Sequence, residues 1–126
     1  MARPLKILVA DDDEGFRDEL LLSLGSAGYD VAGVENGAFA LRSLEAHRVD
    51  ILLTDWLMPE MDGVELVRAV RGRWPKVKIV AISSGGSMEW SMVSRAANAF
   101  GVDDILQKPV SFGDLLRTIQ RLSPPE

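Results

Sequence analysis

The sequence contains no cysteine and a single histidine, His47, among its 126 residues. Without cysteine, the chain can form no disulfide framework, no thiolate metal site and no cysteine nucleophile. One histidine is too few for a zinc site built from several imidazoles, and it argues against a catalytic triad centred on histidine. The chemistry that remains open uses carboxylates, hydroxyls and amines.

Long apolar runs and an excess of positive charge are also missing. No apolar stretch approaches the ~20 residues that cross a bilayer. The short apolar stretch near the N-terminus ends at three aspartates, unlike a signal peptide. The 14 basic and 19 acidic residues give a net charge of −5, which argues against direct binding to nucleic acid. We therefore expect a cytoplasmic protein with no membrane segment.

Short apolar segments alternate with segments of helical periodicity along the chain. The strand-like segments cover 5–10, 31–34, 50–54, 78–82 and 104–107, and the helical patterns cover 16–27, 38–44, 64–70, 92–100 and 115–122. This order predicts one α/β domain over residues 1–126, with a core from about 5 to 122, a parallel sheet and helices on both faces. Residues 123–126 are expected to be a tail or the start of a linker.

Three local features carry further expectations. Segment 31–34 is the weakest strand pattern and suits a sheet edge. Asn36-Gly37 predicts a turn before the second helix. Basic residues gather between positions 68 and 78, where we expect the solvated end of a helix and its following loop.

Polar side chains follow four of the five expected strands, at the point where each strand ends. They are Asp11, Asp12 and Asp13, then Asp55, then Ser83 with Ser84, and finally Lys108. Ligands of open parallel sheets bind beyond the carboxyl ends of the strands. Clustered carboxylates repel one another unless a cation joins them, and such oxygen ligands suit Mg²⁺. A carboxylate could then attack phosphorus while the lysine and a hydroxyl bind the phosphoryl oxygens, so this edge predicts phosphoryl chemistry without a histidine base.

Four motifs at these strand ends resemble those of response regulator receiver domains. They read VADDD at 9–13, LTDWLMPEMDG at 53–63, ISS at 82–84 and DDILQKP at 103–109. Each motif is weak alone, but together they follow the family's order and span almost the whole chain. The resemblance implies a flavodoxin-like, doubly wound sheet of five parallel strands in the order 2-1-3-4-5, with five helices.

The resemblance also assigns roles to individual residues. Asp55 would accept the phosphoryl group, and Lys108 would pair with that group. Asp11 and Asp12 would hold Mg²⁺ together with the Asp55 carboxylate and the backbone carbonyl of Trp56. The remaining implied roles are a switch hydroxyl, a second switch position, a proline after a cis bond and a helix cap: Ser83 (or Ser84, if the register shifts by one), Ile105, Pro109 and Asp13.

The activity of the family supplies the expected function. The donor would be the phosphohistidine of a histidine kinase or of a histidine phosphotransfer protein. Phosphorylation would draw in Ser83 and alter the surface formed by the fourth helix, fifth strand and fifth helix. That surface would act on an output domain or a downstream protein, and it allows a homodimer. Such a domain is no enzyme beyond its own phosphorylation and dephosphorylation.

Some positions depart from the commonest family pattern. Ile105 stands where the family usually has an aromatic residue that couples the site to the output surface. Leu57 and Gly85 flank the path of attacking water in the family, so the resemblance leaves the rate of hydrolysis open.

Three competing interpretations can be weighed against the same residues. An aspartate phosphatase usually has a second aspartate two residues after the nucleophile, where this chain has Leu57. A phosphorylation-independent interaction module of the same fold predicts losses among Asp12, Asp55 and Lys108, and none is lost. A flavin or dinucleotide domain is the third, but no G-x-G-x-x-G follows the first strand.

Overall fold

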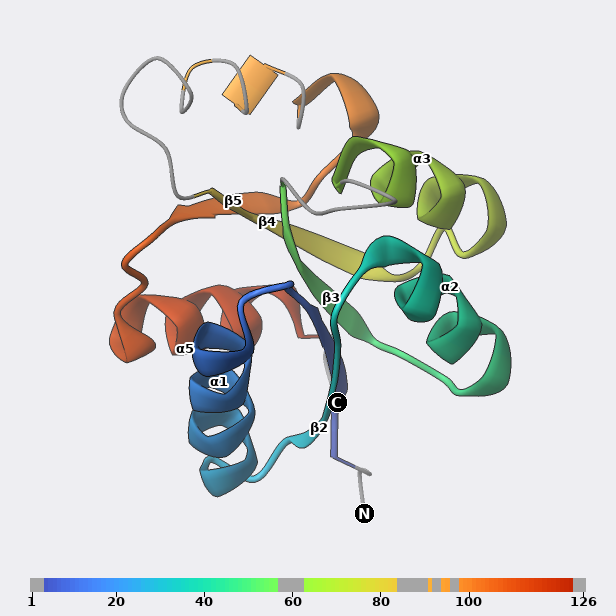
Figure 1. The fold of residues 1–126 in the computed structure, drawn as a ribbon. Coiled ribbons are helices and arrows are strands. Elements are labelled where there is room, and N and C mark those ends of the chain that lie inside the picture. The colour runs from blue at the N-terminus through green and yellow to red at the C-terminus, as the bar shows by residue number, and fades with distance from the viewer. Residues whose placement is uncertain (1–3, 57–62, 84–90, 92–93, 96–97, 124–126) are drawn as a thin grey trace.

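The structure is a computed structural model, and it describes residues 4–56, 63–83, 91, 94–95 and 98–123. Its centre is a sheet of five parallel strands in the order β2-β1-β3-β4-β5 (Figure 1). The strands are β1 (Lys6–Ala10), β2 (Asp30–Val34), β3 (Ile51–Asp55), β4 (Lys78–Ser83) and β5 (Asp104–Gln107). The strand order confirms the expected one, and β2 is an edge strand as its weak apolar pattern predicts.

Helices cover both faces of the sheet. They are α1 (Glu14–Ser26), α2 (Gly37–Ala46), α3 (Gly63–Arg73) and α5 (Phe112–Leu122). The helix expected at 92–100 lies partly outside the described residues, and its described positions 94–95 and 98–100 are helical. α1 and α5 lie on one face, and α2 and α3 lie on the other (Figure 1). No helix within the described ranges is long and apolar enough to cross a bilayer.

The sheet separates two apolar clusters, because successive strand residues point to opposite faces. Leu8 and Leu52 pack with residues of α2 and α3, whereas Ile7 and Ile51 pack with residues of α1 and α5. All four side chains are almost completely buried. Burial on both faces explains why β1 and β3 read as continuous apolar runs rather than as alternating patterns.

The predictions for the starts of α1 and α2 have different outcomes. Asp13 caps α1, and its Oδ1 accepts a hydrogen bond from the Phe16 N–H at 3.1 Å, as predicted. The predicted turn at Asn36-Gly37 lies one residue earlier, at Glu35 and Asn36. Asn36 caps α2 by accepting from the Phe39 N–H at 2.9 Å, and Gly37 is already the first helical residue. Asparagine serves both structures because its short side chain bonds nearby backbone groups.

The basic stretch between positions 68 and 78 is not solvated throughout. Arg71 on α3 is half-buried, and its guanidinium donates to the backbone carbonyls of Gly101 and Val77 at 2.9 and 2.6 Å. The same group donates to the carboxylate of Asp103 at 2.6 Å. The prediction of a solvated helix end is therefore wrong for Arg71, which ties α3 to the segments that precede β4 and β5.

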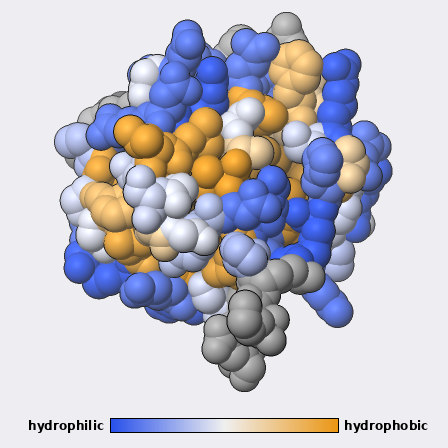
Figure 2. Space-filling model, turned by 90° about the horizontal axis from the view of Figure 1, so that it is seen from below, coloured by the Kyte–Doolittle hydropathy of each residue, from blue (hydrophilic) through white to orange (hydrophobic). Residues whose placement is uncertain are grey.

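Apolar side chains gather on the side of the molecule that Figure 2 shows, which is the side seen from below in Figure 1. They lie toward the middle of this view, and hydrophilic side chains surround them (Figure 2). Leu22 on α1 is 74% exposed, the largest value among the exposed large hydrophobic residues of the described segments. Exposed apolar side chains that gather on one face suit a protein partner.

Candidate functional site

The predicted site residues meet at the carboxyl edge of the sheet. β1 and β3 are paired almost to their last residues, so Asp11, directly after β1, lies beside Asp55, the last residue of β3. Ser83 ends the neighbouring strand β4, and Lys108 directly follows β5. The strand register therefore brings together residues that are up to 97 positions apart, from Asp11 to Lys108 (108 − 11 = 97).

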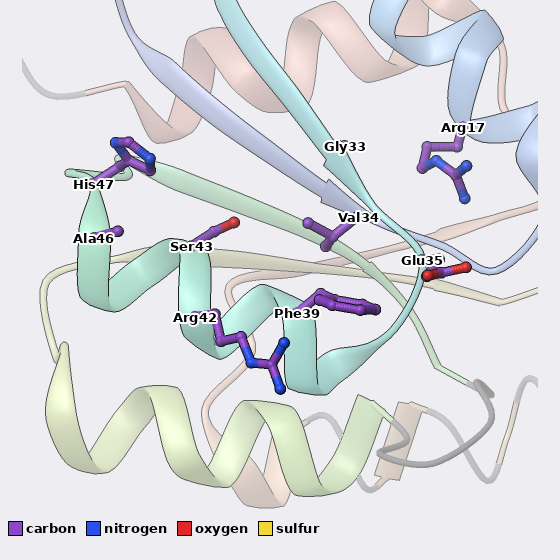
Figure 3. A pocket seen from close by; sticks show the side chains of 9 residues that line it. All are labelled: Arg17, Gly33, Val34, Glu35, Phe39, Arg42, Ser43, Ala46 and His47. Carbon is purple, nitrogen blue, oxygen red and sulfur yellow. The ribbon is translucent and has the colours of Figure 1, made fainter.

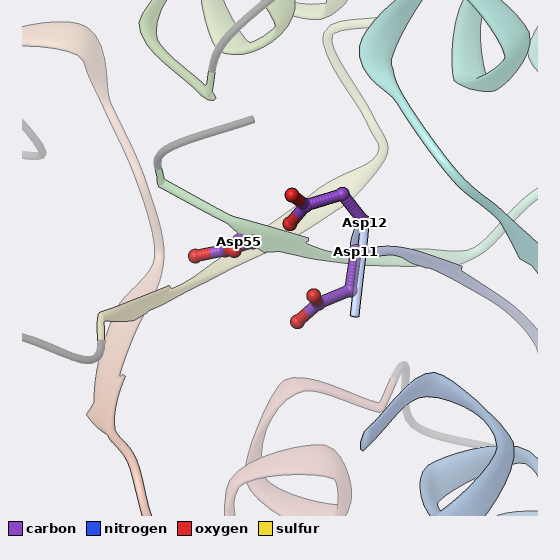
Figure 4. Close-up of side chains that lie close together, drawn as sticks. All are labelled: Asp11, Asp12 and Asp55. Atoms are coloured by element: carbon purple, nitrogen blue, oxygen red, sulfur yellow. The ribbon is translucent and has the colours of Figure 1, made fainter. Parts of the chain in front are cut away.

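Three carboxylates form the centre of this edge. Asp11 and Asp12 come from the end of β1, and Asp55 comes from the end of β3 (Figure 4). One oxygen from each lies within 4.8 Å of the others. Asp11 and Asp55 are 1% and 7% exposed, whereas Asp12 is open to solvent. The arrangement has the spacing of a cation site that can be reached from outside.

Lys108 lies between two of these acids. Its Nζ is 3.0 Å from Oδ2 of Asp11 and 3.8 Å from Oδ2 of Asp55. The same ammonium lies 4.2 Å from the centre of the Phe16 ring, which is a cation–π contact. The helical pattern predicts Phe16 only as a core residue, and no spacing in the sequence indicates that its ring holds the lysine.

Asp11 has one carboxylate oxygen without a hydrogen bond. Its Oδ1 accepts from the Asp13 N–H at 2.9 Å. Its Oδ2 is in ion-pair range of Lys108, but the geometry is not that of a hydrogen bond, and this buried oxygen has no hydrogen-bond partner. A buried charged oxygen without a hydrogen bond is costly. A cation would remove that cost, and donors that are all oxygens, with an exposed Asp12, fit Mg²⁺.

The backbone carbonyl of Trp56 is held by the start of α3. The Gly63 N–H donates to it at 2.9 Å, and because a carbonyl oxygen has two lone pairs, one remains for a cation. A Cβ at Gly63 would lie 2.8 Å from Cα of Trp56 and 2.9 Å from the carbonyl oxygen of Asp55. Glycine is therefore required here by the close approach of two backbones. The indole of Trp56 is buried in the core.

The other predicted positions have mixed outcomes. Ser83 is buried, and its carbonyl accepts from the Lys108 N–H at 2.7 Å. The bond between Lys108 and Pro109 is cis, as the resemblance implies. Ile105 is half-buried and packs against the cluster on the α2 and α3 side. Leu57, Ser84 and Gly85 lie outside the described residues.

Comparisons with known proteins agree with this geometry. The family model of the response regulator receiver domain matches residues 7–120. Response regulator MprA of Mycobacterium tuberculosis is 34% identical over 125 residues, which are 97% of this chain and 53% of MprA. Response regulator receiver protein CpdR of Brucella abortus is 37% identical over 117 residues, which are 93% of this chain and 95% of CpdR. The chain thus spans about half the length of MprA and nearly all of CpdR.

Solved structures share the same fold. Chemotaxis protein CheY4 of Vibrio cholerae is 31% identical and superposes with a TM-score of 0.86, over 95% of this chain and 99% of CheY4. A response regulator receiver protein from Pseudomonas putida is 28% identical, also with a TM-score of 0.86, over 96% of this chain and 99% of that protein. The similarity therefore covers the sheet, the helices and the edge where the three carboxylates meet.

Proposed function

Because this chain belongs to the response regulator receiver family, we propose that it takes a phosphoryl group onto Asp55 and that this changes its binding surface. The observation that carries the proposal is the arrangement at the sheet edge: three carboxylate oxygens lie within 4.8 Å of one another beside the Lys108 ammonium. Acids and a lysine in this arrangement suit the binding of a divalent cation and an anionic phosphoryl group.

In the proposed reaction, Asp55 is the nucleophile. One of its carboxylate oxygens attacks phosphorus in a phosphohistidine, the P–N bond breaks, and the electron pair stays with the donor imidazole, which takes up a proton. The product is an acyl phosphate, which water later hydrolyses to phosphate and the free carboxylate. The donor is a histidine kinase or a histidine phosphotransfer protein, and the chain catalyses no other reaction.

The remaining residues act on charge and position. Lys108 is within 4 Å of both Asp11 and Asp55, so its ammonium can neutralise charge on either residue and on the phosphoryl oxygens. Asp11, Asp12, Asp55 and the carbonyl of Trp56 would hold Mg²⁺. When bound, Mg²⁺ would supply positive charge that stabilises the negative charge on the transferring phosphoryl group.

The output of the switch is the surface of the fourth helix, β5 and α5. Ser83 ends β4 and is paired with Gln107 of β5, so a movement of Ser83 would act directly on β5. Ile105 is already half-buried, and its side chain is stiff at χ1 because it is β-branched. We therefore expect little rotamer change at Ile105 on phosphorylation; the segment after Ser83, where the main movement is predicted, lies outside the described residues. The partner is an output domain or a downstream protein in the cytoplasm, and a homodimer through this surface is compatible with the proposal.

The test is the mass of the intact protein after treatment with acetyl phosphate. With Mg²⁺, the parent should gain one phosphoryl group, and it should gain none when EDTA replaces Mg²⁺. Asp55→Asn keeps the size of the side chain but removes the nucleophile, so it should stay unmodified. A full mass gain in Asp55→Asn would contradict the assignment, and no gain in the parent would favour a phosphorylation-independent module. Steady turnover of a generic phosphate ester would favour a phosphatase.

A further inference from the structure

Arg17 connects the candidate site to the edge strand β2. It lies in the first turn of α1, where its N–H donates to the carbonyl of Asp13 at 2.9 Å. Side chains of a helix lean toward its N-terminus, so that of Arg17 reaches back past the cap. Its Nη1 donates to the backbone carbonyl of Asp11 at 2.7 Å. The guanidinium thus contacts the main chain of a residue whose carboxylate belongs to the acidic cluster.

The stem of Arg17 is placed by β2. A Cβ at Gly33 would lie 3.0 Å from Cδ and 3.1 Å from Cγ of Arg17, and 2.9 Å from Cδ1 of Leu21. Gly33 is not among the described glycines with positive φ, which are Gly28 and Gly101. Space, rather than backbone conformation, therefore favours glycine at this position, because a side chain here would displace those of Arg17 and Leu21. The stem of Arg17 occupies the volume that a side chain at position 33 would fill, and Arg17 lines the same surface pocket as Val34 and Glu35 (Figure 3).

Three polar atoms of Asp11 form hydrogen bonds and the fourth, Oδ2, is in ion-pair range of Lys108; Arg17 supplies one of these hydrogen bonds. The N–H of Asp11 donates to the carbonyl of Val34 at 3.1 Å. Its carboxylate oxygens meet the Asp13 N–H and the Lys108 ammonium. Its carbonyl follows the last residue of β1, and it accepts from Arg17. A buried carbonyl without a donor is unfavourable, so without Arg17 the peptide unit of Asp11 could turn to find another partner. Asp12 follows that peptide unit directly.

We propose that Arg17 is a positioning residue: it fixes the backbone of Asp11 so that the carboxylates of Asp11 and Asp12 are preorganised for a divalent cation. This inference rests on the proposed function, which supplies the cation. Gly33 supports the same arrangement, because its lack of a side chain leaves room for the aliphatic part of the Arg17 side chain. The role predicted for Arg17 concerns geometry, since a positive charge this close to a cation site opposes cation binding.

The sign of that charge effect makes the inference testable. If Arg17 acted only through its charge, Arg17→Met would bind Mg²⁺ more tightly than the parent. If Arg17 positions Asp11, Arg17→Met binds Mg²⁺ more weakly. Arg42→Met is the matched control. Arg17 and Arg42 line the same surface pocket, of about 520 Å³, and each substitution removes one positive charge. The Arg42 guanidinium lies over the Phe39 ring, 5.1 Å from its centre, rather than at the carbonyl of Asp11.

The experiment is a calorimetric titration of the full chain with MgCl₂. We expect the Kd of Arg17→Met to rise about tenfold, the effect of losing one hydrogen bond from a charged donor. Arg17→Lys keeps a donor and should fall between Arg17→Met and the parent. Gly33→Ala keeps the guanidinium but displaces its stem, so its Kd should also rise. Arg42→Met should bind as tightly as the parent or slightly more tightly.

Two further readouts separate the possible failures. A merely structural role for Arg17 would lower the melting temperature and leave the Kd for Mg²⁺ unchanged, so both are measured on each variant. A folded Arg17→Met that binds Mg²⁺ as tightly as the parent, or more tightly, overturns the inference and leaves the proposed function intact. A parent that binds no Mg²⁺ overturns both.

Discussion

Acidic residues stand at both ends of the parallel strands, the amino edge and the carboxyl edge of the sheet, and their surroundings differ. At the amino edge, directly before β3 and β5, Asp50 and Asp103 each accept hydrogen bonds from one guanidinium and from one backbone N–H. The donors are Arg48 and Lys6 for Asp50, and Arg71 and Ile79 for Asp103. At the carboxyl edge, three acids lie together, and Lys108 forms ion pairs with both Asp11 and Asp55.

This difference separates acids that stabilise the fold from acids that serve the site. A carboxylate that accepts from a guanidinium and a backbone N–H gains charge-assisted hydrogen bonds that offset the cost of its partial burial. Carboxylates that share one lysine repel one another, and one oxygen of Asp11 has no hydrogen bond. Under the proposed function, the carboxyl edge is ready for a cation and an anion, and the repulsion among its carboxylates costs stability.

The largest effect that would test this comparison is the response to Mg²⁺. A ligand that binds only the folded state stabilises it by about 2.7 kcal/mol at a hundredfold excess over its Kd. We expect thermal unfolding of the parent to shift upward accordingly, and we expect Asp12→Ala to lose this shift because it removes an exposed residue that we propose as a ligand. Emission of Trp56, whose carbonyl is another proposed ligand, offers a second signal.

Asp13→Ala is the matched control for the Mg²⁺ experiment. It removes a neighbouring acid of the same run, but Asp13 is the cap of α1. The variant should be less stable by about 1 kcal/mol and should keep the full Mg²⁺ shift. The metal site is misplaced if Asp12→Ala responds to Mg²⁺ as strongly as the parent.

The second-largest expected effect concerns Asp103, whose carboxylate already has hydrogen-bond donors. Asp103→Ala leaves the Arg71 guanidinium and the Ile79 N–H without their shared acceptor. We expect the free energy of unfolding to fall by about 2 kcal/mol, less than for a fully buried pair because both side chains are partly exposed. Urea unfolding without Mg²⁺ measures it. Under the same conditions Asp12→Ala should lose nothing or gain slightly, because it relieves repulsion. Equal losses in both variants would remove the distinction between the two edges.

The sequence predicts the ends of the strands well, and with them most of the site. Asp55 and Lys108 end apolar runs that local pattern identifies, and parallel pairing then brings their positions together. Asp13 is also recognisable, because capping depends on residues only three positions apart. Asn36 shows the limit of such local rules, since the same side chain suits a turn and a cap.

The sequence does not predict which groups the long side chains contact. Arg17, Phe16 and Arg71 each act through a partner that only the fold brings near: the carbonyl of Asp11, the ammonium of Lys108 and the carboxylate of Asp103. Periodicity identifies the face of a helix but not the point that a flexible stem reaches. Gly33 illustrates the same limit. Within the sequence it only weakens a strand, whereas in the fold it makes room for Arg17.

The smallest predicted effect is a dependence on pH at the amino edge. Burial raises the pKa of Asp50, but the hydrogen bonds from the Arg48 side chain and the Lys6 N–H, with the Arg48 charge, outweigh it and hold the pKa below the ordinary value of 3.8. A carboxyl whose pKa is lowered by folding contributes stability above its unfolded pKa, and loses it as the pH falls through its folded pKa. The stability advantage of the parent over Asp50→Asn should therefore be present at pH 5 and shrink toward pH 3, and its size should stay below about 1 kcal/mol because the Arg48 side chain is partly exposed.

Urea unfolding at both pH values measures this difference. Asp18→Asn on the exposed side of α1 is the control, because it removes the same charge. An advantage that is constant between the two pH values, or that grows as the pH falls, would mean that Asp50 is not compensated as the geometry indicates, and the contrast between the two edges would then rest on Asp103 alone.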